Sequence, residues 1–249
     1  MPFPDGGTIP AELQDIVKPL ILGALVDLDG VLLDTERAKY EALRDILAEF
    51  DIHLTPQQYG QHYGGLGGID IQNKLIRNYQ HLQATGGPEI WNRRRKRLDE
   101  ILENGTPVFP YAAEALDFFR QNGVYIAAAT SAGDTETHLK LTNTGLLALF
   151  DHVVTGDQVK AKKPAPDIYN RARTLLGFEV GNCIAFEDMQ TGVESAVAAG
   201  ISCVAIPNDF SRHQDFSKAI YVAQTLQDAV AYVREHYSTP QSIAQLVSR

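Results

Sequence analysis

Residues 20–31 read LILGALVDLDGV, an apolar run that leads directly into two aspartates and a glycine. The run is too short to span a membrane and is bounded by Pro19 and Gly30, which is typical of a buried strand in a parallel sheet. Asp27 and Asp29 are two residues apart, so in extended backbone their side chains point to the same side. Two carboxylates placed together repel each other unless a positive charge lies beside them. The pair therefore indicates either a charged site at the end of a strand, or one aspartate that caps the next segment and another that is simply exposed.

The composition is ordinary for a soluble globular protein. The chain has 249 residues, of which 44% are hydrophobic and 21% are charged, and its formal net charge is −9. This charge argues against a nucleic-acid surface, no apolar run is long enough for a membrane helix, and the first residues lack the basic start of a secretory signal. Cys183 and Cys203 lie in apolar runs and offer no disulfide framework, so we expect buried thiols rather than a catalytic cysteine. These features favour a cytoplasmic protein that binds neither nucleic acid nor membrane.

Strand and helix patterns alternate along most of the chain. After the first strand, further buried strands are expected at 124–129, 152–155, 183–186 and 202–206. Helical patterns that each end before a glycine are expected at 111–122, 135–144, 166–176 and 191–199. This alternation predicts an α/β fold with a parallel sheet between layers of helices.

The connection between the first two strands is much longer than the others. About a hundred residues separate Asp27 from Val124, although a parallel crossover needs only about a dozen. Apolar residues recur at helical spacing in 43–50, and 88–103 is another helical run. We therefore predict an inserted all-helical cap domain. Its expected place divides the chain into an N-terminal arm with the first strand (1–34), the cap (35–103) and the remainder of the core (104–249).

Polar side chains follow the other predicted strands at the points where those strands end. In open α/β sheets, ligands bind at the carboxyl ends of the strands, so this placement favours a single site over scattered structural residues. The side chains are Thr130 and Ser131 after the second strand, Lys162 and Lys163 after the third, and Glu187 and Asp188 at the fourth.

Four segments carry a resemblance to a known family: DLDGVLLDTE from residue 27, ATS from 129, VKAKKPAPDIYNRA from 159 and CIAFEDMQTGVESAVAAG from 183. In order and spacing they resemble the four motifs of the haloacid dehalogenase (HAD) superfamily, in the branch of β-phosphoglucomutase-like phosphatases and mutases with a helical cap after the first strand. The resemblance covers about residues 20–228. It implies a Rossmann-like core, Mg²⁺ as cofactor, and phosphoryl transfer through an aspartyl-phosphate.

The resemblance gives roles to the charged residues of these motifs, and a charge balance supports those roles. Asp27 is expected to be the nucleophile, and Asp29 to protonate the leaving oxygen and then take a proton from the attacking water. A carboxylate beside a phosphate dianion is repelled by about 4 kcal/mol per charge pair at ~4 Å and an effective dielectric near ~20, so cations are required. By resemblance, Asp27, Asp188 and the backbone carbonyl of Asp29 hold the Mg²⁺, and Lys163 adds a point charge on the transferring group.

The remaining polar residues are expected to support the phosphoryl group or the metal ligands. Thr130 donates a hydrogen bond to the phosphoryl group, and Ser131 either does the same or merely caps a turn. Glu187 either binds the metal or, as we favour, orients the ligands and waters around it. Lys162 is interpreted as a solvated neighbour of Lys163.

Several other segments have a structural interpretation. The basic run 91–97 (WNRRRKR) spreads around a helix, which indicates a solvated face with a minor role in attracting anionic substrates. Segment 63–68 (YGGLGG) lacks the ending of a P-loop and is either a flexible connection or a cap loop that approaches the active site. Asp34 is expected to hold the turn before the cap, and Asp167 to lie in the first turn of a helix. Residues 11–17 are expected to form an additional helix.

The function expected from these residues is Mg²⁺-dependent hydrolysis of a small phosphomonoester, such as a sugar or polyol phosphate. Dehalogenases and phosphonoacetaldehyde hydrolases of the family lack an aspartate at the position of Asp29, so the presence of Asp29 disfavours these two activities here. The β-phosphoglucomutases carry a histidine at the position of Lys39 and a basic residue in the cap loop, so no group that would hold a second phosphate is evident here. A sugar phosphomutase and a non-catalytic protein that binds a phosphorylated metabolite are the alternatives.

Overall fold

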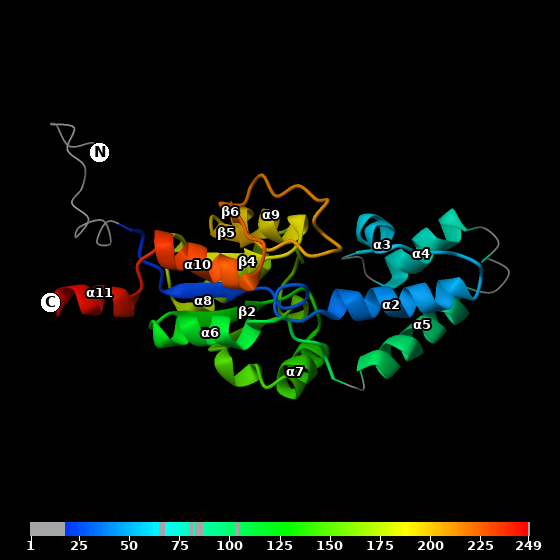
Figure 1. The fold of residues 1–249 in the computed structure, drawn as a ribbon, viewed down its shortest axis with the longest axis horizontal. Helices are drawn as coiled ribbons and strands as arrows, with labels where there is room; N and C mark the ends of the chain where they lie inside the picture. The colour runs from blue at the N-terminus through cyan, green and yellow to red at the C-terminus, as the bar shows by residue number, and fades with distance from the viewer. Residues whose placement is uncertain (1–17, 65–67, 80–81, 83–86, 103–104, 249) are drawn as a thin grey trace.

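A six-stranded sheet forms the centre of the computed structural model (Figure 1). The structure describes residues 18–64, 68–79, 82, 87–102 and 105–248. Every strand pairs with its neighbours in parallel, in the order β3-β2-β1-β4-β5-β6. The strands are β1 (Gly23–Val26), β2 (Tyr125–Ala129), β3 (His152–Val154), β4 (Cys183–Glu187), β5 (Ser202–Ala205) and β6 (Tyr221–Val222). The predicted α/β fold with a parallel sheet is confirmed, and β6 is a short edge strand that the sequence patterns did not predict.

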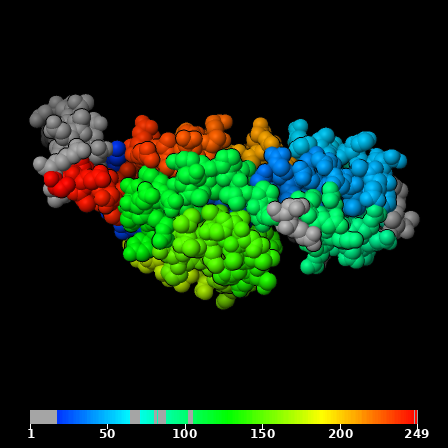
Figure 2. All heavy atoms as spheres, turned by 60° about the horizontal axis from the view of Figure 1, so that its bottom comes forward, coloured from blue at the N-terminus to red at the C-terminus, as the bar shows by residue number. Residues whose placement is uncertain are grey.

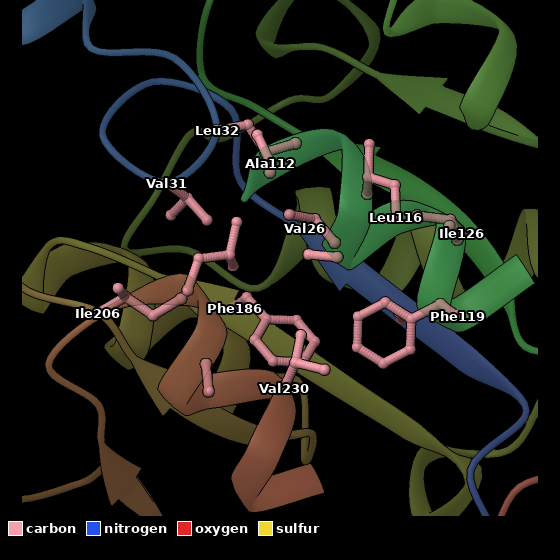
Figure 3. Packing of buried hydrophobic residues seen from close by; sticks show 14 of the residues in the cluster. Val26, Val31, Leu32, Ala112, Leu116, Phe119, Ile126, Phe186, Ile206 and Val230 are labelled. Atoms are coloured by element: carbon pink, nitrogen blue, oxygen red, sulfur yellow. The ribbon is translucent and has the colours of Figure 1, made fainter. Parts of the chain in front are cut away.

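Helices cover both faces of the sheet, because alternate residues of each buried strand point to opposite faces. On one face, Phe119 of α6, Phe186 of β4 and Val230 of α10 meet in an apolar cluster (Figure 3). The rings of Phe119 and Phe186 lie 5.4 Å apart. On the other face, α8 and α9 pack against the alternate strand residues. The helices of the core are α6 (Ala112–Gln121), α7 (Asp134–Asn143), α8 (Asp167–Leu176), α9 (Gln190–Ala198), α10 (Leu226–His236) and α11 (Pro240–Val247).

In the described residues between β1 and α6, four further helices follow one another, and we call them the helical insertion. They have a hydrophobic cluster of their own, separate from the two clusters of the sheet. The insertion occupies the end of the molecule opposite α11 (Figures 1 and 2). Its helices are α2 (Thr35–Ala48), α3 (Pro56–His62), α4 (Gly68–Asn78) and α5 (Gly87–Leu102).

One segment of the core, residues 206–216, reaches from the end of β5 into the helical insertion. Its Phe210 is 2% exposed and belongs to the hydrophobic cluster of the insertion. The Phe210 ring lies 5.5 Å from the ring of Tyr40 and 5.4 Å from that of Tyr59. A Cβ at Gly60 would lie 2.0 Å from the Phe210 carbonyl oxygen, so α3 packs directly on this backbone. The insertion is thus held to the core by packing as well as by the chain on either side of it.

The remaining sequence expectations have different outcomes. Cys183 and Cys203 are both buried and free, as expected. Among the described residues, no helix is both long and apolar enough to cross a membrane. The helix expected at 11–17 and the centre of the glycine-rich segment, 65–67, lie outside the described residues.

Candidate active site

The polar residues predicted from the strand ends lie around one cavity of about 480 Å³ at the carboxyl edge of the sheet. The core supplies one wall of this cavity, and helices α2, α3, α4 and α5 of the insertion supply the other. A pocket of this size is large enough for a small metabolite. All predicted site residues line it: Asp27, Asp29, Thr130, Ser131, Lys163, Glu187 and Asp188. Lys162, which was interpreted as a solvated neighbour of Lys163, also lies in the lining.

Lys163 is the buried cation of the core wall. Its Nζ lies 2.6 Å from Asp27 Oδ1 and 2.5 Å from Glu187 Oε1, and it donates a hydrogen bond of 2.7 Å to the Ala129 carbonyl oxygen. Burial alone would lower the pKa of Lys163, but the two carboxylates raise it above its usual value. Lys163 therefore stays charged and links the ends of β1, β2 and β4. The Glu187 oxygen also accepts a hydrogen bond of 2.6 Å from the Tyr169 hydroxyl.

Asp27, Glu187 and Asp188 form a buried acidic cluster beside Lys163. Each offers an oxygen within 4.8 Å of the others. Burial raises the pKa of Asp27 to about 7 despite Lys163, and burial, with Asp27 and Glu187 next, raises that of Asp188 well above its usual range. Asp188 Oδ1 is buried without a hydrogen-bond partner among the described residues. When all three carboxylates are ionised, they carry more negative charge than Lys163 neutralises, and a divalent cation would balance that excess.

The backbone at Gly30 fits closely around this cluster. Its φ is +94°, in the left-handed region that favours glycine, and a Cβ there would lie 2.0 Å from Asp188 Oδ2. The same Asp188 oxygen accepts a hydrogen bond of 2.8 Å from the Asn208 side chain. Asn208 also donates to the Gly30 carbonyl oxygen at 3.3 Å, and thereby joins the two loops.

Asp29 is held by cations and by a hydroxyl group. Thr35 Oγ1 donates to it at 2.5 Å and Lys140 Nζ donates at 2.9 Å. Burial alone would raise the pKa of Asp29, but Lys39 and then Lys140, together with the hydrogen bond from Thr35, hold it well below its usual value. Lys140 was not predicted as a site residue. The sequence feature that could have identified it is its position on the buried face of α7, three residues after Thr137 and next to Leu141.

Thr130, Ser131 and Lys162 also belong to the core wall of the cavity. Thr130 is buried, and its Oγ1 accepts a hydrogen bond of 3.1 Å from the Ala132 backbone. The carbonyl oxygen of Ser131 accepts a hydrogen bond of 3.1 Å from Lys162, whose side chain is exposed, as expected of a solvated neighbour. Outside the cavity lining, Asp34 accepts a hydrogen bond of 2.8 Å from Arg37 at the start of α2, and Asp167 lies in the first turn of α8.

The prediction of a solvated face for residues 91–97 is wrong for Arg94. Arg94 is 5% exposed and lines the cavity. By contrast, Arg93 forms an ion pair near the surface with Glu49, just after α2, and Arg97 forms one with Asp45 of α2. The reason is helical spacing: Arg94 is four residues after the buried Ile90 and four before Leu98, which also lines the cavity. The insertion therefore presents a guanidinium group to the site.

The comparison with protein families agrees with the four motifs. A family model described as haloacid dehalogenase-like hydrolase matches residues 24–206, which run from β1 to the end of β5 and include the helical insertion. The chain belongs to this family. One relative of this hydrolase is the protein CbbY of Rhodobacter capsulatus, 30% identical over 211 residues, with 80% of this chain and 91% of CbbY covered. Another is a phosphorylated carbohydrates phosphatase of Thermotoga maritima, 31% identical over 182 residues, with 71% of this chain and 81% of the relative covered.

Solved structures of HAD proteins have the same overall fold as this hydrolase. A HAD family hydrolase from Deinococcus radiodurans, solved with bound phosphate and sodium, is 25% identical with a TM-score of 0.74; 88% of this chain and 97% of that chain are covered. A putative β-phosphoglucomutase from Thermotoga maritima has a TM-score of 0.71 at 24% identity, with 86% and 99% covered. The family resemblance expected from the motifs is confirmed.

Proposed function

We propose that this HAD hydrolase is a Mg²⁺-dependent phosphatase that hydrolyses a small phosphomonoester, a sugar or polyol phosphate, through an aspartyl-phosphate. The observation that carries the proposal is the buried cluster of Asp27, Glu187 and Asp188 against Lys163, with Asp29 beside it in the same cavity. The relatives support the substrate class, since one of them is named a phosphatase of phosphorylated carbohydrates.

The residues of the acidic cluster suit a hard divalent cation. Mg²⁺ prefers oxygen ligands, and Asp188 has a buried oxygen without a partner among the described residues. We assign Asp27, Asp188 and the backbone carbonyl of Asp29 as the protein ligands. Glu187 Oε1 is already used by Lys163 and Tyr169, so we keep Glu187 as the residue that orients Lys163 and the ligands. When bound, the cation would neutralise negative charge on the reacting phosphoryl group.

Asp27 and Asp29 divide the chemistry between them. Asp27 attacks phosphorus, and the bond from phosphorus to the leaving oxygen breaks as Asp29 gives that oxygen a proton. Asp29, now a carboxylate, takes a proton from the water that attacks the aspartyl-phosphate, which frees Asp27 and inorganic phosphate. Lys39 and Lys140 favour the carboxylate form of Asp29, which suits its role as the base that takes a proton from water. For Asp29 to act as the acid that protonates the leaving oxygen, its contacts with these two lysines must first weaken. We assign Thr130 and Ser131, which line the cavity, as hydrogen-bond donors to the phosphoryl oxygens.

The test is phosphate release from a panel of phosphorylated sugars and polyols, with and without EDTA. We expect Mg²⁺-dependent release by the wild type, and loss of release in Asp27→Asn and Asp29→Asn with unchanged circular dichroism. Full activity in either variant or in EDTA would contradict the mechanism. Failure of the wild type to release phosphate from any member would favour the non-catalytic alternative.

A second experiment separates hydrolysis from mutase activity. The protein is incubated with β-glucose 1-phosphate, with and without β-glucose 1,6-bisphosphate, and followed by phosphorus NMR. We expect free phosphate without a requirement for the bisphosphate. Rapid formation of glucose 6-phosphate that depends on the bisphosphate, with little free phosphate, would establish the mutase instead.

A further inference from the structure

Arg94 is a buried cation of the helical insertion that has no ion-pair partner in the described part of the chain. Its side chain lines the cavity from α5, the residue is 5% exposed, and its Nε is buried without a hydrogen-bond partner in the ranges that the structure describes. The guanidinium carbon lies 4.6 Å from the centre of the Trp91 ring. This stacking contact packs one face of the guanidinium group and leaves its in-plane N–H donors to be satisfied by something else.

The other charged groups on the same wall already neutralise each other. Lys39 Nζ lies 2.8 Å from Glu36 Oε1, and Glu36 Oε2 accepts a hydrogen bond of 3.0 Å from the Tyr59 hydroxyl. Glu36 and Lys39 both line the cavity, as Arg94 does. Counted together, Glu36, Lys39 and Arg94 leave one positive charge on the insertion wall. Glu36 attracts Arg94 at longer range, but it is in direct contact with Lys39 and not with Arg94.

An unpaired buried charge is unfavourable unless an ion of opposite sign binds to it. Burial lowers the pKa of Arg94, but a guanidinium group remains protonated in proteins. Its planar fork of donors matches a carboxylate or a phosphate group in two parallel hydrogen bonds. The energy lost when Arg94 is buried is therefore recovered when an anion enters this part of the cavity.

We propose that Arg94 binds a second anionic group of the substrate, a carboxylate or a second phosphate, at the end away from the phosphoryl group that reacts. The core wall, with Asp27 and Lys163, takes the reacting phosphoryl group, and the insertion wall takes the distal anion. This inference rests on the proposed phosphatase function and narrows it to substrates with two anionic ends. It also revises the expectation that the insertion lacks a group for a second phosphate.

A matched series of substrates tests the proposal. Glucitol 6-phosphate and 6-phosphogluconate have the same linear six-carbon chain and differ at the distal end by a hydroxymethyl group against a carboxylate; glucitol 1,6-bisphosphate carries a phosphate there. The wild type should prefer the two compounds with an anion at each end over glucitol 6-phosphate by about 10- to 100-fold in kcat/KM, the range expected for hydrogen bonds to a charged group. The comparison of carboxylate with phosphate shows which of the two anions the site takes.

Three variants separate binding from packing. Arg94→Met keeps the apolar stem beside Trp91 but removes the charge, and should reduce the preference for a distal anion to about threefold or less, while Arg94→Lys should retain part of it. Arg95→Gln, an exposed position on the same helix, is the control and should keep the wild-type preference. A purely structural Arg94 would change overall activity without changing the ratio between the substrates.

The outcomes distinguish this inference from the proposed function. Wild-type kcat/KM values that agree within about threefold across the series, or an Arg94→Met variant that keeps the preference, would overturn the role of Arg94 and leave the phosphatase proposal standing. If the wild type releases no phosphate from any compound, the phosphatase proposal fails. Calorimetric binding of 6-phosphogluconate then decides the role of Arg94: weaker binding to Arg94→Met than to wild type supports it, and equal binding overturns it.

Discussion

Asp27 is buried among carboxylates with a single lysine beside it, and its pKa rises to about 7. Folding therefore favours the protonated form of Asp27. As the pH rises, the metal-free protein must form a carboxylate in a buried position, which is unfavourable. The stabilisation that Asp27 provides is complete below its ordinary pKa near 3.8 and is lost as the pH rises through about 7. Asp29 affects stability in the opposite direction. Its pKa is lowered in the folded protein, so its carboxylate stabilises the fold at pH values above its ordinary pKa, and this stabilisation is lost only in acid.

The first prediction follows from the direction of the effect at Asp27. In metal-free protein, the melting temperature of Asp27→Asn minus that of wild type should increase as the pH is raised from about 4.5 to about 7.5, because only the wild type must bury the new charge. Asp29 is ionised throughout this range, so it does not contribute to the change. Scanning calorimetry in EDTA measures the difference. A difference that is constant with pH, or that falls, would show that Asp27 is not buried against net negative charge.

The second prediction concerns the close fit at Gly30. Gly30→Ala introduces both left-handed backbone strain and a Cβ in contact with Asp188, whereas Gly145 has a φ of +72° and open space where a Cβ would lie. Gly145→Ala should therefore cost about 1–2 kcal/mol of stability from strain alone. Gly30→Ala should cost more and should also weaken Mg²⁺ binding, as measured by calorimetric titration. Equal losses of stability with unchanged Mg²⁺ affinity would contradict the contact with Asp188.

The residues at the strand ends could be placed together from the sequence, whereas their partners could not. Asp27 and Asp188 follow buried apolar runs, so the rule for parallel sheets brings them to one edge. Lys140 and Arg94 lie on helices, where a charged residue between apolar positions is normally read as solvated. Their burial depends on which face of the helix meets another element, and that is decided by tertiary packing.

At the scale of elements, the strands and core helices that the sequence patterns predicted agree with the structure to within a few residues at most ends, whereas α10 and α11 were not predicted. The strand expected at 202–206, for example, is β5 at Ser202–Ala205. The two-residue strand β6 has too few residues for any periodicity to appear. The contact of segment 206–216 with the helical insertion is equally hidden, because an isolated Phe210 in a polar loop indicates nothing about its partner.

The third prediction tests that contact. Phe210→Ala removes a buried ring from the insertion cluster and should lower the free energy of unfolding of the insertion by about 3–5 kcal/mol. Hydrogen exchange should accelerate at the amides of α2 and α3 much more than at those of the central strands. Leu139→Ala, at a position that is 61% exposed, is the control and should change little. Uniform acceleration across the sheet and the insertion would show that Phe210 does not stabilise the insertion in particular.

At the scale of the whole molecule, we expect a bound cation to stabilise the folded chain, because it would neutralise the buried carboxylates at the cavity. The fourth prediction is that Mg²⁺ raises the melting temperature. At a free concentration about 100-fold above Kd, binding stabilises the folded state by about 2.7 kcal/mol, which corresponds to roughly 5–10 °C for a chain of this size. Asp188→Ala should abolish the shift, and Asp167→Ala, at an acidic position in the first turn of α8, should keep it. A shift that persists in Asp188→Ala would place the metal elsewhere.

Phe210 also bears on how such proteins can be recombined. By chain order this residue belongs to the sheet, but its neighbours Tyr40 and Tyr59 are in the helical insertion. In a chimaera, the continuous segment from α2 to α5 could be exchanged on its own for that of a relative. The Phe210 ring would then contact side chains to which it is not matched, and the donor segment would have a cavity where its own contact with segment 206–216 is missing. The transferable unit consists of two pieces of chain, the helices of the insertion and residues 206–216, which must be grafted together.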